Sequence, residues 1–402
     1  MNRTGKQDEP RGCLAACLTP SGRGAIATVV VWGVDARQCV SRFFQPAGKR
    51  PLSERPPREI AFGVWGTDDC RGEELVVCCR DDATVEVQCH GGRAAVERIL
   101  ADLASQGCRV VPSSEWITSR YADAVEAAAR GALSQATTER TAAILLDQLR
   151  GAWRRELTRI AELVEAANQT GREPIEARER LRSLDLRADI GRHLTSPWKV
   201  VLAGFPNVGK SLLMNRLLGY ERSIVFDQAG TTRDVLSGRT AFDGWPVELL
   251  DTAGLRISDD SIESAGVERA RRQLLAADLI VLVADARDPM TEARLRDELG
   301  LEPLSLRQPF LFVANKSDLL AGTPPVPNSV ADDVLLVSAL TGEGVSQLMA
   351  AIVRRLVPVQ LAAGDAVPFT PAQGHQLAEW IGNPSLLCQR SDSTRDIGLA
   401  PN

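Results

Sequence analysis

The stretch Gly204-Phe-Pro-Asn-Val-Gly-Lys-Ser211 decides the fold of the central part of this chain. It fits the pattern G-x-x-x-x-G-K-[ST], in which glycines let backbone N–H groups turn inward around phosphate oxygens. The apolar run Trp198–Ala203 before it is predicted to form a buried strand, and residues 212–218 after it have helical spacing that ends at Gly219. A strand, a glycine-rich loop and a helix in this order predict a phosphate-binding site at the N-terminus of that helix.

The composition describes an ordinary globular protein. The chain has 402 residues, of which 44% are apolar and 25% charged, and this length has room for about two or three domains. Its net charge of −5 gives no global attraction to nucleic acid or to membranes, so RNA binding would need a local patch. No apolar run approaches the roughly 18 residues that cross a bilayer, and the N-terminus is a poor secretory signal. We therefore expect a cytoplasmic protein without a membrane partner.

The cysteines offer little support for a metal site. Eight of the nine lie between Cys13 and Cys108, and the ninth is Cys388. The chain has no Cys-x-x-Cys pair and only three histidines, so a zinc site has no support from spacing. We expect reduced, mostly buried cysteines that act as small apolar residues.

Residues 1–115 are predicted to form a small α+β domain. Strand-like and helical runs alternate in it, and Asp81-Asp82 is predicted to be a hairpin turn between two of the strands. The expected strands are residues 24–32, 74–79, 84–88 and, more weakly, 109–111, with helices within 35–44 and 90–106.

Residues 116–196 are predicted to be the first part of a helical domain. Apolar residues recur there at three- and four-residue spacing, which puts them on one face of an α-helix: Leu145, Leu149, Trp153, Leu157, Ile160 and Val164. Ten arginines and eight acidic residues lie between Arg150 and Arg192. A solvated, salt-bridged helix face explains them better than an RNA-binding patch.

Residues 197–356 are predicted to form a P-loop domain with a mostly parallel sheet and helices on both of its faces. Asp243-Gly244 reads as a hairpin turn, so we expect one antiparallel strand at a sheet edge. Residues 357–402 should be a short helical and disordered remainder, with a short helix over 372–381. The P-loop domain is thus inserted in a short helical domain and preceded by the α+β domain.

A second motif favours guanine over adenine. Asn315-Lys-Ser-Asp318 follows the predicted strand 310–314, and the Asp318 carboxylate can accept from the guanine N1–H and exocyclic amine, a donor pair that adenine lacks. Ser338-Ala-Leu340 after the last strand adds a further base contact. The expected GTP-binding residues are Asn207, Val208, Gly209, Lys210, Ser211, Leu212, Asp251, Gly254, Asn315, Lys316, Asp318, Ser338, Ala339 and Leu340.

Oxygen-bearing residues around the phosphate loop are suited to Mg²⁺. Ser211 and Thr232 are the expected direct ligands, and Asp251 is expected to hold the ion through water. Lys210 would reach the β- and γ-phosphates, and the Gly254 N–H would touch the γ-phosphate, so both are candidate catalytic groups.

Position 255 holds a leucine where many GTPases place a water-orienting glutamine. A leucine can neither orient water nor stabilise charge. Hydrolysis must therefore draw on another residue, a partner or a bound cation.

Together these motifs resemble the MnmE (TrmE) tRNA-modification GTPase family. The central part contributes Gly204–Ser211 with Asn207, Gly230–Asp234, Asp251–Leu255, Glu263, Gly266–Ala270, Asn315–Asp318 and Ser338–Leu340. The N-terminal part agrees independently through Thr19–Gly24, which resembles the family's opening segment, and Val87–Gly92, which resembles its L-Q-x-H-G-G stretch. The similarity covers most of residues 13–356.

The resemblance implies a mechanism that compensates for Leu255. In this family a potassium ion sits where an arginine finger would act; Asn207 matches the asparagine that binds it, and residues 227–232 match the loop that wraps it. Glu263 matches the glutamate that orients the attacking water through a second water.

The resemblance also implies partners. The family forms a homodimer through N-terminal domains that bind a tetrahydrofolate derivative, and Arg23 is our candidate for the folate site. With the FAD protein MnmG, the family modifies C5 of the wobble uridine of certain tRNAs.

The sequence departs from the family pattern at its far end. The family ends in C-x-G-K, with a cysteine needed for modification, whereas here Cys388 is followed by Gln389 and the chain ends in Pro401-Asn402. The family's T-G-E-D stretch is also replaced, by Arg80–Ala83. An alternative is therefore a regulatory GTPase of the same family that has lost modification activity and binds a partner or small ligand through its N-terminal domain. A ribosome-assembly GTPase is disfavoured, because no appended RNA-binding module is found.

Overall fold

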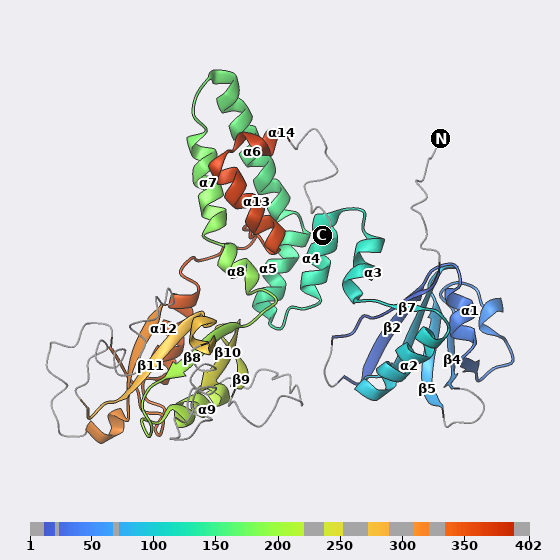
Figure 1. Cartoon of the computed structure of the whole chain (residues 1–402), viewed down its shortest axis with the longest axis horizontal. Coiled ribbons are helices and arrows are strands. Elements are labelled where there is room, and N and C mark those ends of the chain that lie inside the picture. The colour runs from blue at the N-terminus through green and yellow to red at the C-terminus, as the bar shows by residue number, and fades with distance from the viewer. Residues whose placement is uncertain are drawn as a thin grey trace. The chain divides into compact units, whose positions relative to one another are not determined.

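The computed structural model describes residues 12–20, 24–66, 72–220, 237–251, 272–288, 309–320 and 334–389 (Figure 1). These residues fall into two compact units, one reaching Ser134 and the other starting at Gln135. Within the described ranges, no helix is both long and apolar enough to cross a bilayer.

The N-terminal unit is built on a seven-stranded sheet with the order β3-β4-β5-β6-β2-β1-β7. Neighbouring strands are antiparallel except β1 and β7, which run parallel. The strands are β1 (Leu14–Cys17), β2 (Ile26–Trp32), β3 (Phe44–Pro46), β4 (Ile60–Trp65), β5 (Glu73–Cys79), β6 (Thr84–His90) and β7 (Arg109–Val110).

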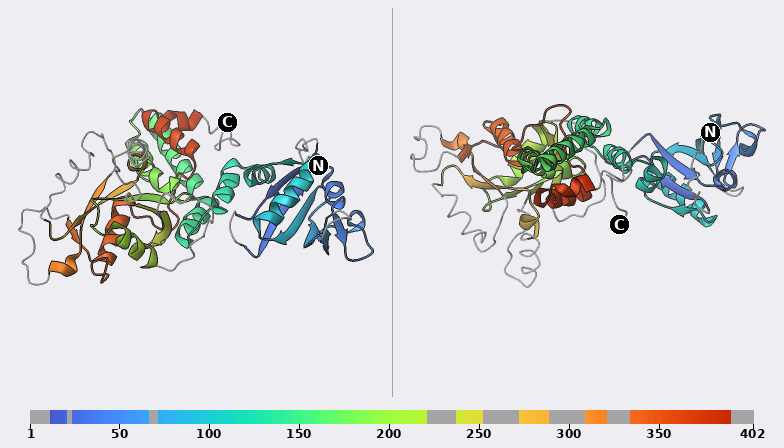
Figure 2. Two further views of the ribbon diagram at one scale, coloured as in Figure 1. Left: turned by 60° about the horizontal axis from the view of Figure 1, so that its bottom comes forward. Right: turned by 90° about the horizontal axis from the view of Figure 1, so that it is seen from above.

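Helices cover the two faces of this sheet unequally. On one face α1 (Ala36–Ser41) and α2 (Arg93–Ser105) bury a continuous core with alternate residues of the strands, and α2 lies across that face in Figure 2. On the other face, α3 (Ser113–Arg120) packs Trp116 against Trp32, with ring centroids 4.9 Å apart. The 3-10 turn η1 (Leu52–Glu54) and α4 (Ala124–Leu133) complete the unit.

The structure confirms the expected strands, helices and hairpin of this region and adds three strands. β5 and β6 pair across the predicted turn, and the Arg80 N–H donates to the Thr84 carbonyl at 2.9 Å. β1 and β3 are too short to give a period-two pattern. β4 escaped notice because Ile60, Phe62 and Val64 are apolar but exposed, so apolar residues occupy both faces of the strand and remove the alternation.

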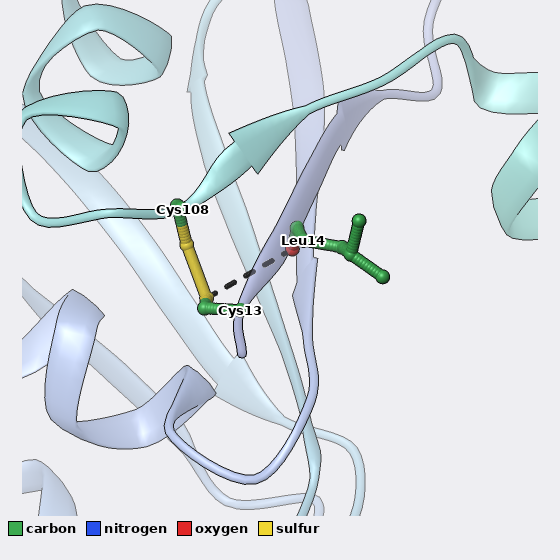
Figure 3. The surroundings of a disulfide bond; sticks show 3 residues. All are labelled: Cys13, Leu14 and Cys108. Carbon is green, nitrogen blue, oxygen red and sulfur yellow. Dashed lines mark hydrogen bonds between the residues drawn. A yellow bond between two sulfur atoms is a disulfide. The ribbon is translucent and has the colours of Figure 1, made fainter. Parts of the chain in front are cut away.

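The expectation that all cysteines are reduced is wrong for two of them, because Cys13 and Cys108 form a disulfide (Figure 3). Their Cα atoms are 4.6 Å apart, and the Arg109 N–H donates to the Cys13 carbonyl at 2.8 Å, so the β1–β7 pairing itself brings them together. Cys39 on α1 lies beside the pair, with the three sulfur atoms within 4.8 Å of one another. The pairing could not be predicted from the sequence, because the two cysteines are 95 residues apart in the chain.

The second unit begins with four helices, and two helices from the C-terminal part of the chain pack against them. These are α5 (Glu139–Leu149), α6 (Ala152–Thr170), α7 (Ile175–Asp185) and α8 (Ala188–Arg192), against which α13 (Pro371–Gly382) and α14 (Ser385–Gln389) pack (Figures 1 and 2). The helix expected over 372–381 is therefore confirmed. The single helical face expected over 145–164 is divided between α5 and α6, because Gly151 adopts a left-handed conformation with φ of 91°.

The central sheet has six strands in the order β13-β12-β11-β8-β10-β9. All neighbours are parallel except the edge hairpin β9–β10, which turns at Asp243-Gly244 as predicted. The bounds are β8 (Trp198–Ala203), β9 (Ser237–Phe242), β10 (Trp245–Asp251), β11 (Leu279–Asp285), β12 (Phe310–Asn315) and β13 (Val334–Leu336).

Both faces of this sheet are covered. Helices α9 (Lys210–Tyr220) and α12 (Val345–Leu356) pack together on one face, and α9 runs through Gly219, where the sequence predicted its end. On the other face, Leu274 from the helical residues 272–275 packs against Val201 and Ala203.

Side chains from α5 and from the residue after α8 contact this sheet. The Arg140 guanidinium lies 3.1 Å from the Asp243 carboxylate and over the ring of Trp245. His193, just after α8, stacks on Trp198 at the start of β8 with centroids 3.6 Å apart.

Candidate nucleotide-binding site

The candidate site lies at the carboxyl edge of the central sheet, where ligands bind in open α/β folds. The parallel strands β8, β10, β11 and β12 all end there. Three of these strands end in a polar residue, namely Asp251, Asp285 and Asn315, and β8 is followed directly by Gly204, the first residue of the phosphate loop. Register places Asp285 directly beside Asn315.

The phosphate loop needs its glycines for space. A Cβ on Gly204 would lie 2.1 Å from the Val283 carbonyl oxygen, and one on Gly209 would lie 2.5 Å from the Asn315 side-chain nitrogen. Gly209 also has φ of 92°, and Asn207 has φ of 66°, in the left-handed region that asparagine tolerates better than most residues. The loop therefore curls tightly at the start of α9.

The Lys210 side chain lies inside this loop and contacts its backbone. Its ammonium donates to the carbonyls of Gly204 and Phe205, both at 2.8 Å, and only 5% of the residue is exposed. Burial lowers the pKa of Lys210, while the nearby Asp251 carboxylate opposes that shift. The charge is thus held at the centre of the loop, where phosphate oxygens would gather.

Ser211 and Asp251 meet across two elements. The Ser211 hydroxyl at the start of α9 donates to the Asp251 carboxylate at the end of β10, at 2.7 Å, and Asp251 is 1% exposed. A hydroxyl and a carboxylate oxygen side by side are ligands that Mg²⁺ accepts. The sequence analysis predicts that both residues take part in binding Mg²⁺. The structure shows that they are in direct contact.

The second motif braces the phosphate loop. The Asn315 amide donates to the Val208 carbonyl at 2.8 Å and its oxygen accepts from the Ala339 N–H at 3.0 Å, so one buried side chain ties together three loops. The Lys316 ammonium donates to the Asn207 carbonyl at 2.6 Å. These contacts fix the distance between the phosphate loop and the predicted base-binding loop.

Asp318 lies in the 3-10 turn η3 (Ser317–Leu320) and accepts from the Ser338 hydroxyl at 2.5 Å. Ser338 is fully buried, so the carboxylate is held by a rigid partner. Arg216 on α9 donates to the carbonyls of Ala339 and Leu340, which fixes that loop to the helix after the phosphate loop.

Sequence reasoning missed Asp285 and Arg287. The Asp285 carboxylate lies 2.9 Å from the Lys316 ammonium and 2.7 Å from the Arg287 guanidinium. Hydrogen bonds from Arg287, together with those from Lys316, hold the pKa of Asp285 well below its usual range despite an opposing effect of burial. An acid that directly follows a buried strand at the carboxyl edge was the signal that could have identified it.

The remaining expected residues fall into two groups. Val208 and Ala339 are buried in the loops, whereas Leu212 and Leu340 are exposed by 49% and 67%. Other expected positions lie outside the described residues, namely Gly254, Leu255, Thr232 with its loop, Glu263 and Arg23.

A strand, phosphate loop and helix, joined to an Asn-Lys-x-Asp motif by direct hydrogen bonds, define a P-loop GTPase. Two family models match the chain in agreement with this class. Residues 199–316 match the 50S ribosome-binding GTPase model, and residues 13–123 match the model of the GTP-binding protein TrmE N-terminus.

The matched relatives define the family. The chain is 33% identical over 385 residues to the tRNA modification GTPase MnmE of Symbiobacterium thermophilum, covering 85% of this chain and 82% of that protein. It is 34% identical to the protein of the same name from Chloroflexus aurantiacus, covering 91% and 86%. The chain belongs to the MnmE family of tRNA modification GTPases. Among solved structures, Era of Aquifex aeolicus is a partial likeness, with 28% identity, a TM-score of 0.32 and coverage of 43% of this chain and 62% of that one.

Proposed function

We propose that this GTPase acts in modification of C5 of the wobble uridine in tRNA. The observation that carries the proposal is the combination, in one chain, of a TrmE-type N-terminal unit with a GTPase site, matched along most of its length to tRNA modification GTPases. Hydrolysis of GTP would drive a conformational change that the modification needs, because loops ordered by the γ-phosphate and its Mg²⁺ are released when that phosphate leaves.

We propose further that potassium activates the hydrolysis. Asn207 supports this, because its left-handed backbone turns the loop at this point and Lys316 fixes its carbonyl. A potassium ion held by Asn207 and by the carbonyls of residues 227–232 would supply the positive charge that Leu255 lacks. Glu263 would then orient the attacking water, and Gly254 would contact the γ-phosphate.

Magnesium would be held by Ser211 and Thr232, with Asp251 bound to it through water. The 2.7 Å hydrogen bond between Ser211 and Asp251 supports this set, because it places the two oxygens next to each other. The ion would offset the negative charge of the β- and γ-phosphate oxygens. Lys210 would offset the same charge from the side of the phosphate loop.

We propose that the N-terminal unit pairs with the same unit of a second copy. Ile60, Phe62 and Val64 on β4 support this, because their outward faces are exposed by 67%, 54% and 37% and together form an apolar stripe. Large exposed apolar residues in a row are typical of an interface. The same unit would bind a tetrahydrofolate derivative, with Arg23 as a candidate contact.

The modification would need an FAD-containing partner of the MnmG type and would take place in the cytoplasm, where tRNA is found. A regulatory GTPase without modification activity is the competing function.

Complementation tests the proposal. The full chain is expressed in a bacterial strain that lacks its own MnmE, and the wobble-uridine nucleosides of its tRNA are measured by mass spectrometry. Restored modified nucleoside is the expected result. Unmodified tRNA from a strain that contains folded, GTP-hydrolysing protein would reject the proposal in favour of the regulatory one.

A further inference from the structure

A cavity of about 850 Å³ lies among the helices of the second unit, away from the nucleotide site. Helices α6 and α7, the residue just before α8 and the loop 364–366 form its walls. Five arginines line it against three acidic side chains, in a chain whose net charge is negative. They are Arg154, Arg155, Arg159, Arg180 and Arg187, opposed by Glu156, Glu162 and Asp365.

The helical repeat explains why arginines gather here. Trp153, Leu157 and Ile160 bury one face of α6. Arg155 and Arg159, four residues apart, therefore share a different face and project beside each other toward the cavity. The exposed face of α6 thus presents two guanidinium groups one helical turn apart.

Arg187 is the less exposed of the two paired arginines in the wall, with 18% of its side chain accessible against 29% for Arg180. Its guanidinium donates to the Ala366 carbonyl at 3.0 Å and lies 3.4 Å from the Asp365 carboxylate. The buried Gln148 holds the same loop by donating to the Asp365 carbonyl at 2.9 Å. The Arg187 Nε is buried and has no hydrogen-bond partner among the described residues. These contacts hold this part of the wall together, and they leave one buried donor without a partner among the described residues.

The positive charges of the cavity are only partly neutralised. Arg180 pairs with Glu156 at 2.9 Å, and Arg187 with Asp365. In contrast, the one partner of the Arg155 guanidinium in the described part of the chain is the backbone carbonyl of Arg150. The Arg159 guanidinium makes no hydrogen bond or ion pair with any residue that the structure describes. A salt-bridged helix face, as expected from the sequence, therefore accounts for Arg180 and Arg187 but not for Arg155 and Arg159.

We propose that this cavity binds phosphate groups, with Arg155 and Arg159 as the principal contacts. Planar guanidinium groups bind phosphate oxygens through paired, charge-assisted hydrogen bonds, which suits them to this ligand better than to a simple halide. A volume of about 850 Å³ accommodates a nucleotide-sized group. The hydroxyls of Thr158 and Ser183 in the wall add neutral donors. The phosphate would come from an RNA backbone or from a free phosphate ester.

The test measures binding of two probes to the full chain with its guanine site saturated by GDP and Mg²⁺. One probe is cytidine monophosphate, whose base cannot satisfy the guanine motif, and the other is a short fluorescent RNA stem–loop. Arg155→Gln with Arg159→Gln removes the two contacts. Arg182→Gln is the matched control, because Arg182 is an exposed arginine of α7 outside the cavity.

The unmodified chain should bind at least one probe, and the double variant should bind it at least about tenfold more weakly. Binding of the mononucleotide identifies free phosphate esters as ligands, and binding of the stem–loop alone, with a shallower salt dependence in the double variant, identifies the RNA backbone. No binding of either probe overturns the proposal, as does equal binding by the double variant and by Arg182→Gln.

Folding and GTP turnover are controlled in the same samples. The Arg159→Gln single variant loses a side chain that has no partners among the described residues, so its thermal unfolding should match that of the parent chain. If the double variant unfolds, weaker probe binding by this single variant still tests the proposal. GTP turnover should stay unchanged in all variants, so failure of phosphate binding is distinguishable from failure of the proposed GTPase function.

Discussion

The Lys316 ammonium donates to the Asn207 carbonyl at 2.6 Å and pairs with Asp285 at 2.9 Å. One side chain thus connects the phosphate loop, the Asn-Lys-x-Asp motif and the end of β11. Lys316 itself has φ of 69°, a conformation that costs energy for a non-glycine residue and is retained because its ammonium is held by contacts with two other elements. The phosphate loop and the loop predicted to bind the base are therefore joined by direct contacts.

GTP turnover should be about a hundredfold faster in potassium than in sodium at equal ionic strength, because a bound cation would supply the charge that Leu255 cannot. The measurement is phosphate release under saturating GTP in each salt. Asn207→Ala should remove the difference between the two salts. Equal rates for the parent chain would eliminate the cation.

Replacement of Glu263 by alanine should slow hydrolysis by about a hundredfold with little change in GTP affinity, because its proposed role is to orient water in the transition state. Single-turnover hydrolysis and equilibrium binding of a fluorescent GTP analogue measure the two quantities separately. Glu268→Ala, in the same sequence region, serves as the control. Unchanged turnover in Glu263→Ala would reject the assignment.

Asp318→Asn should weaken GTP binding by about tenfold or more and shift preference toward xanthosine triphosphate, because an amide no longer accepts both guanine donors. Competition between the two nucleotides measures the preference. Ser338→Ala separates positioning from recognition: it removes the hydroxyl that holds Asp318 at 2.5 Å, so affinity should fall while the preference for guanine remains. Full discrimination by Asp318→Asn would contradict the base-recognition role.

Asp285 should make stability depend on acid pH. Its hydrogen bonds with Arg287 and Lys316 lower the folded-state pKa, so the ionised carboxylate stabilises the fold above the unfolded value of about 3.9. That contribution is lost as pH falls through the folded-state pKa. Asp285→Asn should therefore be less stable than the parent chain at neutral pH, and the difference should shrink below about pH 4.

Urea unfolding at several pH values measures this dependence. Asp185→Asn, at an exposed aspartate of α7, is the matched control. A stability difference between parent and Asp285→Asn that stays constant from neutral to strongly acid pH would refute the role of the ion pair.

The Cys13–Cys108 bond should leave seven titratable thiols of the nine cysteines in unfolded, unreduced protein, and all nine after reduction. Because it closes a loop of about 95 residues, its reduction should destabilise the N-terminal unit by roughly 4.7 kcal/mol through chain entropy. Thiol titration and urea unfolding with and without reductant measure the two effects. Nine thiols before reduction would show that the bond does not form.

Several features were predictable because they depend on residues close together in the chain. The phosphate loop, the Asp243-Gly244 hairpin and the Asn315–Asp318 motif each combine a local pattern with the strand beside it, so their place in the fold followed from order alone. β4 was not predictable, because apolar residues on both of its faces remove the alternation of polar and apolar residues that identifies a strand.

The sequence by itself determined the class of the central domain, its mostly parallel sheet with one antiparallel edge strand, and the nucleotide that its motifs favour, because these depend on short-range spacing. The tertiary structure alone decided that Cys13 meets Cys108, that Asp285 joins the Lys316 contact, and that Arg155 and Arg159 line a cavity with Arg187. Each of these relationships joins residues from different elements. Chain spacing carries no record of such contacts, because packing and register create them only when the elements assemble.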